Sequence, residues 1–264
     1  MNQTGEIIES RIEMGKRKKM PLGQTMEKEG IRLNKYLSDA GVCSRREADR
    51  YIEAGKVKID GEIVTVGTRV YPGQKVTVDG REAIREEEFI LLAFNKPAGI
   101  VCTTTKADPD NIIDFIKYDK RIYPIGRLDK ESEGLILLTN DGSIVNKILK
   151  ASNYHEKEYI VTVNKPLTSD FLEKMSGGVP ILDTVTRPCT VTALSKNSFR
   201  IILTQGLNRQ IRRMCEYLDY RVVSLKRVRI MNIQLGKLNI GGYRKVTDRE
   251  LEELKKSIEI PGEA

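Results

Sequence analysis

The 264-residue chain contains no tryptophan, one histidine and four cysteines, and aromatic residues make up only 6% of it. The cysteines are widely spaced and form no CxxC pair, so a zinc site is not expected. The sequence lacks an apolar run of the roughly 18–20 residues that a membrane helix needs, and residues 1–30 lack the apolar stretch of a secretory signal. We therefore expect a reduced, cytoplasmic protein with an aliphatic core, no metal and no membrane contact.

Positive charge is in excess and is concentrated in one segment. The formal net charge is +8, which by itself is common among soluble proteins. Residues 205–230, however, contain seven Lys or Arg residues against two carboxylates. Such clustering favours a polyanionic partner, for example a nucleic acid.

The N-terminal third of the chain divides into three parts. Residues 1–30 mix charge, Gly and Gln without an apolar period, so we expect a disordered basic arm, with a partly artificial leader as the alternative. Residues 31–78 predict two short helices followed by a small sheet. Residues 79–88 are polar and acidic and are expected to form a linker.

Local signals define the elements of residues 31–78. Apolar residues recur at helical spacing over 31–40. Ser44-Arg45-Arg46-Glu47 predicts a capping box at the start of a helix that reaches Ala54. Asp60-Gly61 predicts the turn of a hairpin.

Residues 89–258 predict a second domain in which strands and helices are mixed without regular alternation. Strands are predicted at 89–94, 135–139, 158–163, 189–193 and 199–204, with an extended segment over 221–235, and helices at 142–150, 169–176, 208–218 and after a capping box that begins at Thr247. This mixture favours an α+β fold with a central, largely antiparallel sheet flanked by helices. Residues 259–264 are expected to form a tail.

Basic residues gather on the two helices predicted for residues 31–54. Arg46 and Arg50 are four residues apart and share a helix face, with Arg45 beside them, and Arg32 and Lys35 come from the preceding helix. Such a group can bind phosphates without reading bases. From the charges alone, a solvated surface is the simpler interpretation.

Three segments of this region resemble the RNA-binding module first seen in ribosomal protein four of the small subunit. They are Ile31–Leu37, Gly41–Ala48 and Gly55–Gly61. The resemblance implies that Arg45, Arg46 and Arg50 face RNA.

The most informative segment is the polar loop Gly126–Gly134, which lies between two apolar stretches. Asp129 stands in this loop beside Arg127 and Lys130, and nearby cations keep a carboxylate ionised even when it is partly buried. An ionised, positioned carboxylate can act as a nucleophile or a base. The alternative is a turn aspartate in a solvated loop.

Motifs across residues 31–250 resemble the pseudouridine synthases of the RsuA/RluB/RluE/RluF family, which act on ribosomal RNA. The motifs are Asn95-Lys96-Pro97-Ala98-Gly99, Gly126-Arg127-Leu128-Asp129, Ser132-Glu133-Gly134-Leu135, Leu138-Thr139-Asn140-Asp141-Gly142, Glu156-Lys157-Glu158-Tyr159 and Gly206–Met214. Residues 155–159, 178–182 and 230–232 are most similar to the F branch of this family. That branch is associated with 23S rRNA and, by the resemblance, with some action on tRNA.

The resemblance implies a role for each site residue. Asp129 is the catalytic carboxylate, and Tyr159 stacks against the target base and takes part in proton transfer at ring carbon five. Arg212 pairs with Asp129. Arg127 fills or props the gap left when the uridine leaves its stack. Whether Asp129 attacks the sugar, attacks the base or removes a ribose proton stays open.

The helix predicted over 208–218 has an apolar and a basic face. Its apolar stripe, which is expected to pack in the core, consists of Ile211, Met214, Cys215 and Leu218. Arg209, Arg212 and Arg213 lie off this stripe. We expect Arg209 and Arg213 to meet phosphates, and Arg212 to point into a cleft and to orient Asp129 through paired hydrogen bonds.

The implied reaction moves the glycosidic bond of uridine from a ring nitrogen to a ring carbon and adds no atoms, so no cofactor is expected. We expect a monomeric enzyme that acts on structured RNA, with 23S rRNA as the first substrate class. Two alternatives stay open. The same chemistry could act on tRNA, alone or as well, or the chain could be a non-catalytic RNA-binding protein of ribosome assembly.

Overall fold

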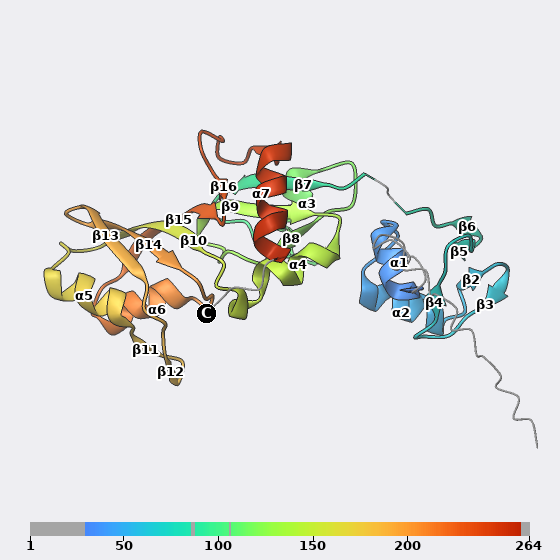
Figure 1. Cartoon of the computed structure of the whole chain (residues 1–264), viewed down its shortest axis with the longest axis horizontal. Coiled ribbons are helices and arrows are strands. Elements are labelled where there is room, and N and C mark those ends of the chain that lie inside the picture. The colour runs from blue at the N-terminus through green and yellow to red at the C-terminus, as the bar shows by residue number, and fades with distance from the viewer. Residues whose placement is uncertain (1–29, 86–87, 106, 260–264) are drawn as a thin grey trace, which may run out of the picture. The chain divides into compact units, whose positions relative to one another are not determined.

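The computed structural model describes residues 30–85, 88–105 and 107–259, which form two compact units (Figure 1). Residues 30–36 and 44–83 make up the first unit, and residues 37–43 and 84–259 make up the second. The expected N-terminal arm and C-terminal tail lie outside the described residues, except for Gly30 and Glu259. In the described part of the chain, no helix has the length and apolarity needed to cross a membrane.

The described part of the first unit contains the first half of one helix and the whole of a second. A short strand, β1 (Ile31–Arg32), pairs with β4 (Arg69–Val70) and leads into α1 (Leu33–Asp39). The predicted helix therefore begins at Leu33 rather than at Ile31, because the first two residues pair with the distant strand β4. The second helix, α2 (Arg45–Glu53), has the predicted capping box: Ser44 Oγ accepts from the backbone of Glu47, whose carboxylate accepts from the Ser44 N–H.

A four-stranded sheet completes the first unit, in the order β3-β2-β5-β6. Its strands are β2 (Val57–Ile59), β3 (Glu62–Ile63), β5 (Val76–Val78) and β6 (Arg81–Glu82). Asp60 and Gly61 form the predicted turn, with φ of 51° and 90°. Strand β6 and the buried Ala83 extend the unit into the stretch expected to be a linker. The prediction missed β6 because both of its side chains are charged, although Asp79-Gly80, with φ of 46° and 78°, forms a second Asp-Gly turn before it.

The second unit is built on a sheet whose described strands follow the order β13-β14-β10-β15-β9-β7-β17, with β8 paired to β9 and β16 to β15. The strands are β7 (Leu91–Lys96), β8 (Tyr123–Ile125), β9 (Glu133–Thr139), β10 (Lys157–Val163), β13 (Thr190–Ser195), β14 (Ser198–Leu203), β15 (Val222–Ile230), β16 (Ile233–Gln234) and β17 (Tyr243–Lys245). Strands β15 and β9 run parallel, whereas their neighbours pair antiparallel. The predicted α+β fold with a largely antiparallel sheet is confirmed.

Helices pack on this sheet. They are α3 (Ile112–Ile116), α4 (Gly142–Leu149), α5 (Ser169–Gly177), α6 (Gln210–Tyr217) and α7 (Asp248–Glu259), together with the 3-10 turn η1 (Ala151–Asn153) and the small hairpin of β11 (Pro180–Ile181) and β12 (Thr184–Val185). Figure 1 shows α5 along β13 and α6 beside the β11–β12 hairpin. Helices α4, α5 and α6 were predicted to within two residues at each end.

The β7–β9 half of the sheet is buried on both faces. Along β9, Leu135 and Leu137 belong to one cluster of buried side chains, whereas Ile136 and Leu138 belong to another. Because successive side chains of a strand point to opposite faces, both faces are covered here.

The half of the sheet formed by β13, β14 and β10 is covered on one face. Phe199 and Ile201 of β14 pack in the cluster that includes α5 and α6. On the opposite face, Ile160 and Arg200 are exposed and lie side by side in register. The parallel pairing of β15 with β9 joins the two halves.

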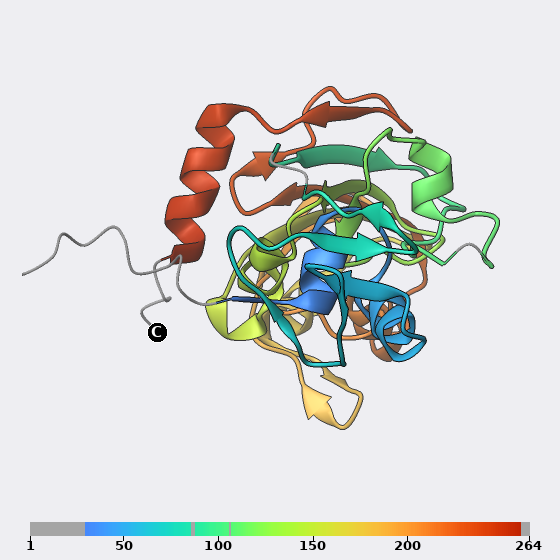
Figure 2. The ribbon, with the colours of Figure 1, turned by 90° about the vertical axis from the view of Figure 1, so that its right-hand side faces the viewer.

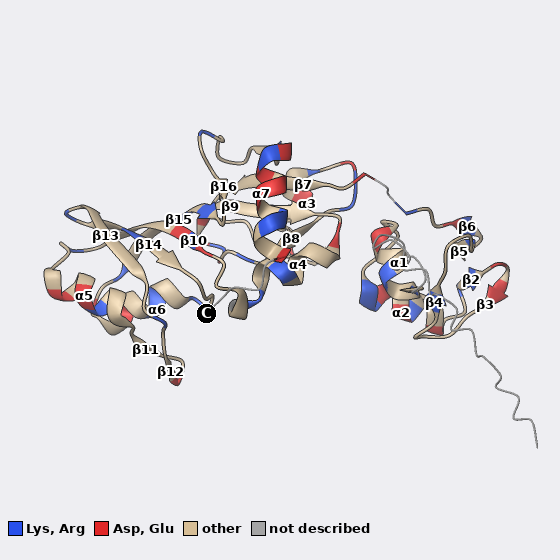
Figure 3. Ribbon diagram, viewed as in Figure 1, with Lys and Arg blue, Asp and Glu red and all other residues tan. Residues whose placement is uncertain are grey.

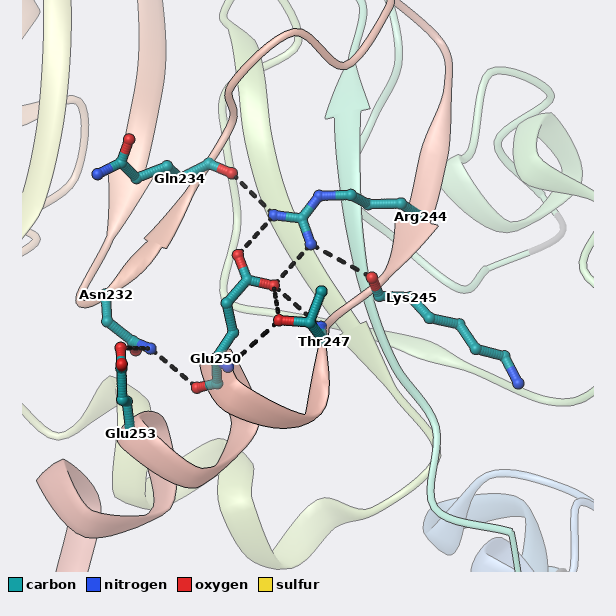
Figure 4. Close-up of polar contacts among 7 residues, drawn as sticks. All are labelled: Asn232, Gln234, Arg244, Lys245, Thr247, Glu250 and Glu253. Atoms are coloured by element: carbon teal, nitrogen blue, oxygen red, sulfur yellow. Dashed lines mark hydrogen bonds and ion pairs between the residues drawn. The ribbon is translucent and has the colours of Figure 1, made fainter.

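A polar network holds the C-terminal helix α7 against the sheet (Figure 4). Arg244 of β17 donates two hydrogen bonds of 2.7 Å to the carboxylate of Glu250 and lowers the pKa of that carboxyl. Thr247 Oγ1 accepts from the Glu250 N–H, and the Glu250 carboxylate accepts from the Thr247 N–H, which confirms the predicted capping box. Figure 2 shows α7 and β17 at one edge of the unit.

Candidate active site

The loop between β8 and β9 carries Asp129, and the buried side chain of Lys96 contacts the backbone of this loop. Lys96 Nζ donates to two carbonyls of its own turn, at 2.8 and 2.7 Å, and lies 3.4 Å from the carbonyl of Lys130. The Gly99 N–H donates to the same Lys130 carbonyl at 2.7 Å. Lys96 is fully buried, and this burial lowers the pKa of its ammonium group. The backbone next to Asp129 is therefore held firmly.

Residues on both sides of Asp129 are also anchored. The buried Leu128 donates its N–H to the Sγ of Cys102 at 3.3 Å. The N–H of the buried Ser132 donates to the Asp129 carbonyl at 3.0 Å. Because the residues on both sides are held by hydrogen bonds, the position of Asp129 is well defined. Its side chain is 32% exposed to solvent.

The loop ends at Gly134 of β9, where the backbones of β9 and β15 lie very close together. Gly134 has φ of +103°, and a Cβ there would lie 2.2 Å from the carbonyl oxygen of Arg227. Gly134 and Arg227 are partners in the parallel register. Only glycine fits at this point, and its presence lets the loop that carries Asp129 lie against β15.

A cleft of about 1050 Å³ opens between the loop, β10, β15 and α6. It brings together five of the predicted site residues, namely Asp129, Tyr159, Arg212, Arg127 and Arg209. We call the exposed Arg127, Lys130 and Arg209 the rim of the cleft, and Lys157, Tyr159 and Arg227 its inner wall. Arg213, on the same helix, is bonded instead to the carbonyl and side chain of Asn208.

Two guanidinium groups face the Asp129 carboxylate. Arg212 Nε and Arg209 Nη1 each lie 3.7 Å from Asp129 Oδ2, which is an ion-pair distance and longer than a hydrogen bond. The paired hydrogen bonds expected between Arg212 and Asp129 are thus not formed in this structure. Arg212 Nη2 instead donates to Ser132 Oγ at 3.1 Å, and its buried Nε lacks a hydrogen-bond partner among the described residues.

Strand β10 places Tyr159 on the inner wall. Tyr159 is in register with Ile201 on one side and Arg227 on the other. The Arg227 Cζ lies 6.0 Å from the centre of the tyrosine ring, and the ring packs against two clusters of the core. These contacts restrict the movement of the ring within the cleft.

Two cations of the inner wall were not predicted as site residues. Arg227 is 3% exposed, and its Nε donates to the carbonyl of Leu135 at 2.6 Å. Lys157 Nζ donates to the carbonyl of His155 at 3.3 Å, and burial together with Arg227 lowers the pKa of Lys157 to about 8. Strand alternation from Tyr159 would have placed Lys157 on the same face, but no pattern in the sequence marks the burial of Arg227.

The predicted RNA-binding residues of the first unit lie on or next to α1 and α2. Arg32, Arg45, Arg46 and Arg50 are exposed, and Lys35 is partly exposed. The Arg45 guanidinium lies 3.4 Å from Asn34 Oδ1 of α1, which links the two helices. Figure 3 shows basic positions on α2 and on α6 of the second unit.

Comparisons with known proteins identify the families to which the two parts of the chain are similar. The family model for RNA pseudouridylate synthase matches residues 90–217, and that for the S4 domain matches residues 31–76. The dual-specificity RNA pseudouridine synthase RluF of Escherichia coli K12 is 56% identical over 231 residues, which cover 87% of this chain and 80% of that protein.

More distant relatives also match most of the chain. Ribosomal large subunit pseudouridine synthase B of Bacillus subtilis 168 is 34% identical over 233 residues, covering 85% of this chain and 95% of that protein. A crystal structure of a pseudouridylate synthase aligns with a TM-score of 0.62 at 29% identity, over 85% of this chain and 99% of the other. The chain therefore belongs to the RNA pseudouridylate synthase family and is an RNA pseudouridine synthase with an N-terminal S4 domain.

Proposed function

We propose that this enzyme isomerises selected uridines of large-subunit (23S) ribosomal RNA, and also of a tRNA, with Asp129 as the catalytic carboxylate. The observation that carries the proposal is the position of Asp129 in the cleft, between two guanidinium groups that each lie 3.7 Å away. The substrate classes are supported by relatives, one of which is named for the ribosomal large subunit and another for dual specificity.

The proposed mechanism starts with a uridine that has left its stack. A base inside structured RNA must be extruded before its reacting atoms can be reached, and the cleft lies at the upper end of the roughly 300–1,000 Å³ of ordinary small-molecule sites. Tyr159 stacks on the uracil from the inner wall. Asp129 acts on the nucleotide as a nucleophile or base while Arg212 orients its carboxylate. The exposed Arg127 occupies the gap in the RNA.

The remaining basic residues bind phosphates. Arg209 and Arg213 act beside the cleft, whereas the proposed contacts of the first unit are Arg32, Lys35, Arg45, Arg46 and Arg50. Replacing Arg45, Arg46 and Arg50 together by Gln should weaken RNA binding and reduce its dependence on salt, because fewer counterions are released. An unchanged slope of affinity against salt concentration would remove α2 from the interface.

The central test is Asp129→Asn, which keeps the size of the side chain and removes its charge. We expect activity to fall by more than about 1,000-fold while RNA affinity stays within about threefold, because the phosphate contacts are intact. Tritium release from uridine-labelled RNA measures the activity. Turnover within tenfold of wild type would reject Asp129 as the catalytic group, and an inactive wild type would favour a non-catalytic role in ribosome assembly.

The substrate is tested by mapping pseudouridines in cells with and without the gene. We expect sites in 23S rRNA to disappear, and a tRNA site as well if both classes are natural substrates. We also infer that the enzyme acts as a monomer, because one chain carries both the cleft and an RNA-binding unit. Sedimentation of the enzyme with and without RNA tests the monomeric state.

A further inference from the structure

The inner wall of the cleft contains two neighbouring cations, Arg227 and Lys157, that no carboxylate of the described residues pairs with. Within the described part of the chain, neither Arg227 nor Lys157 forms an ion pair, and each donates a hydrogen bond to a backbone carbonyl. The Nη2 of Arg227 is buried and has no hydrogen-bond partner among these residues. Both side chains line the same cleft as Asp129.

This arrangement is costly in the free enzyme. A buried charge is normally paired or fully hydrogen-bonded, because removing it from water costs several kcal/mol that a partner must offset. Two like charges beside each other add repulsion, which is seen here in the effect of Arg227 on the pKa of Lys157. A wall of this kind stabilises an anion that comes to lie against it.

The proposed reaction supplies such an anion. When the C1′–N1 bond of uridine breaks, its electron pair goes to the uracil ring and is shared with the carbonyl oxygens O2 and O4. The ring then turns, and C5 supplies the electron pair of the new C1′–C5 bond. C5 loses its proton and N1 gains one, so atoms and electrons balance. If Asp129 instead adds first to the base, the ring oxygens also carry the negative charge.

The depth of the two cations favours the uracil over a phosphate as this anion. Arg227 is almost fully buried, whereas the rim residues that meet an incoming RNA strand are exposed, with 40% exposure for the Arg209 side chain. A detached base is small enough to lie deep in the cleft beside Tyr159. The detached base must also stay in the cleft until the C1′–C5 bond forms.

We propose that Arg227 and Lys157 stabilise the negatively charged uracil between cleavage of the C1′–N1 bond and formation of the C1′–C5 bond. This inference rests on the proposed function, and it assigns the inner wall the part of an oxyanion site. Charges that are fixed in advance where charge develops can contribute about 100-fold or more to a rate. The wall would therefore act on the chemical step and not on RNA binding.

The first experiment compares Arg227→Gln and Arg227→Lys with wild type under single-turnover conditions at saturating RNA. We expect Arg227→Gln to slow isomerisation by about 100-fold with affinity for RNA within threefold, and Arg227→Lys, which keeps the charge, to recover at least a tenth of the wild-type rate. Lys226→Gln is the matched control, because Lys226 lies on the same strand and lines a separate cleft on the outer face of the sheet. It should stay within twofold of wild type.

The second experiment varies the anion itself. RNA with 5-fluorouridine at the target position gives a uracil whose negative charge is stabilised by fluorine, so cleavage should depend less on the wall. We expect the deficit of Arg227→Gln, measured as loss of the intact nucleoside after nuclease digestion, to shrink by about fivefold or more. Lys157 is less buried than Arg227, so Lys157→Gln should slow isomerisation less, and its rate deficit should also shrink on the 5-fluorouridine RNA. This variant replaces Arg227→Gln in the experiment if Arg227→Gln does not fold.

An equal deficit on both RNAs would overturn the proposal, since it would mean that Arg227 only maintains the fold of the site. A loss confined to RNA affinity would assign the cations to a phosphate. If wild type itself converts no uridine, the proposed function fails. An active wild type with fully active Arg227→Gln and Lys157→Gln variants refutes only the role of the wall.

Discussion

The rim and the inner wall of the cleft are both positively charged, but their cations are held in different ways. On the rim, the exposed Arg209 pairs with Glu131 as well as with Asp129. On the inner wall, Arg227 is buried and bonds to a backbone carbonyl. Salt largely screens the interactions of exposed charges over distances longer than about 8–10 Å, whereas buried charges are screened much less. The rim is thus suited to binding a polyanion and the wall to acting on the reacting base.

Arg212 faces Asp129 together with Arg209 of the rim, and of these two arginines its removal should have the larger effect. We expect Arg212→Ala to slow single-turnover isomerisation by about 100-fold or more, because Asp129 loses the less exposed of its two guanidinium partners. RNA affinity should change by less than about threefold.

Arg212→Lys sharpens this prediction. Lysine supplies a point charge but cannot bind Ser132 and face Asp129 at once as the guanidinium does, so it should restore only part of the rate. An Arg212→Ala enzyme within tenfold of wild type would remove the distinction between the less exposed and the more exposed arginine partner of Asp129.

The inner wall also predicts a pH dependence. The pKa of Lys157 is lowered to about 8 by burial and by Arg227, so its charge is lost as the pH rises through 8. The kcat/KM of the free enzyme should fall by about tenfold between pH 7.5 and pH 9 to 9.5. Lys157→Arg stays charged and should abolish this decline, whereas Lys226→Gln should keep it.

Stability should move in the opposite direction over this pH range. The folded-state pKa of Lys157 lies below its ordinary value of 10.5, so the folded chain releases this proton before the unfolded chain does. The contribution of Lys157 to the free energy of unfolding therefore rises between pH 8 and 10.5. Thermal unfolding in parallel with kinetics tests this, and a loss of activity that follows a loss of stability would contradict the assignment.

The rim should show the smallest effect. Arg209→Gln is expected to weaken RNA binding by about fivefold near physiological salt and to reduce the slope of log affinity against log salt by about one. The single-turnover rate at saturating RNA should fall by less than about fivefold, because Arg212 still faces Asp129. A loss of rate as large as that of Arg212→Ala would mean that Arg209 and Arg212 act alike on Asp129.

Local signals in the sequence predicted much of the fold. The capping boxes at Ser44 and Thr247 and the Asp60-Gly61 turn depend on contacts within a few residues, and all three are present. Of the predicted apolar stripe of α6, Ile211, Met214 and Cys215 are buried and Leu218, just after the helix, is partly buried, whereas the burial of Gln210 was not predicted. The motif resemblance then pointed to Asp129 and Arg212, which the fold brings together from distant segments.

Features that depend on distant pairing could not be predicted. Strand β1 exists because β4 pairs with it, and the burial of Arg227 follows from the contact of β15 with β9. The geometry of Arg212 also differs from the expectation, because Ser132 competes for its Nη2. No periodicity in the sequence reports such competition between partners.

The contact between Gly134 and Arg227 bears on how the enzyme matures. The bond from Arg227 Nε to the Leu135 carbonyl joins residues that are 92 apart in the sequence, across parallel strands. Closing so long a loop costs entropy before its contacts form, so this pairing is expected late in folding. During synthesis, Asp129 leaves the ribosome well before Arg227 does. A stalled or shortened chain would contain Asp129 but not Arg227. RNA modification would therefore begin only after the full-length chain has been synthesised.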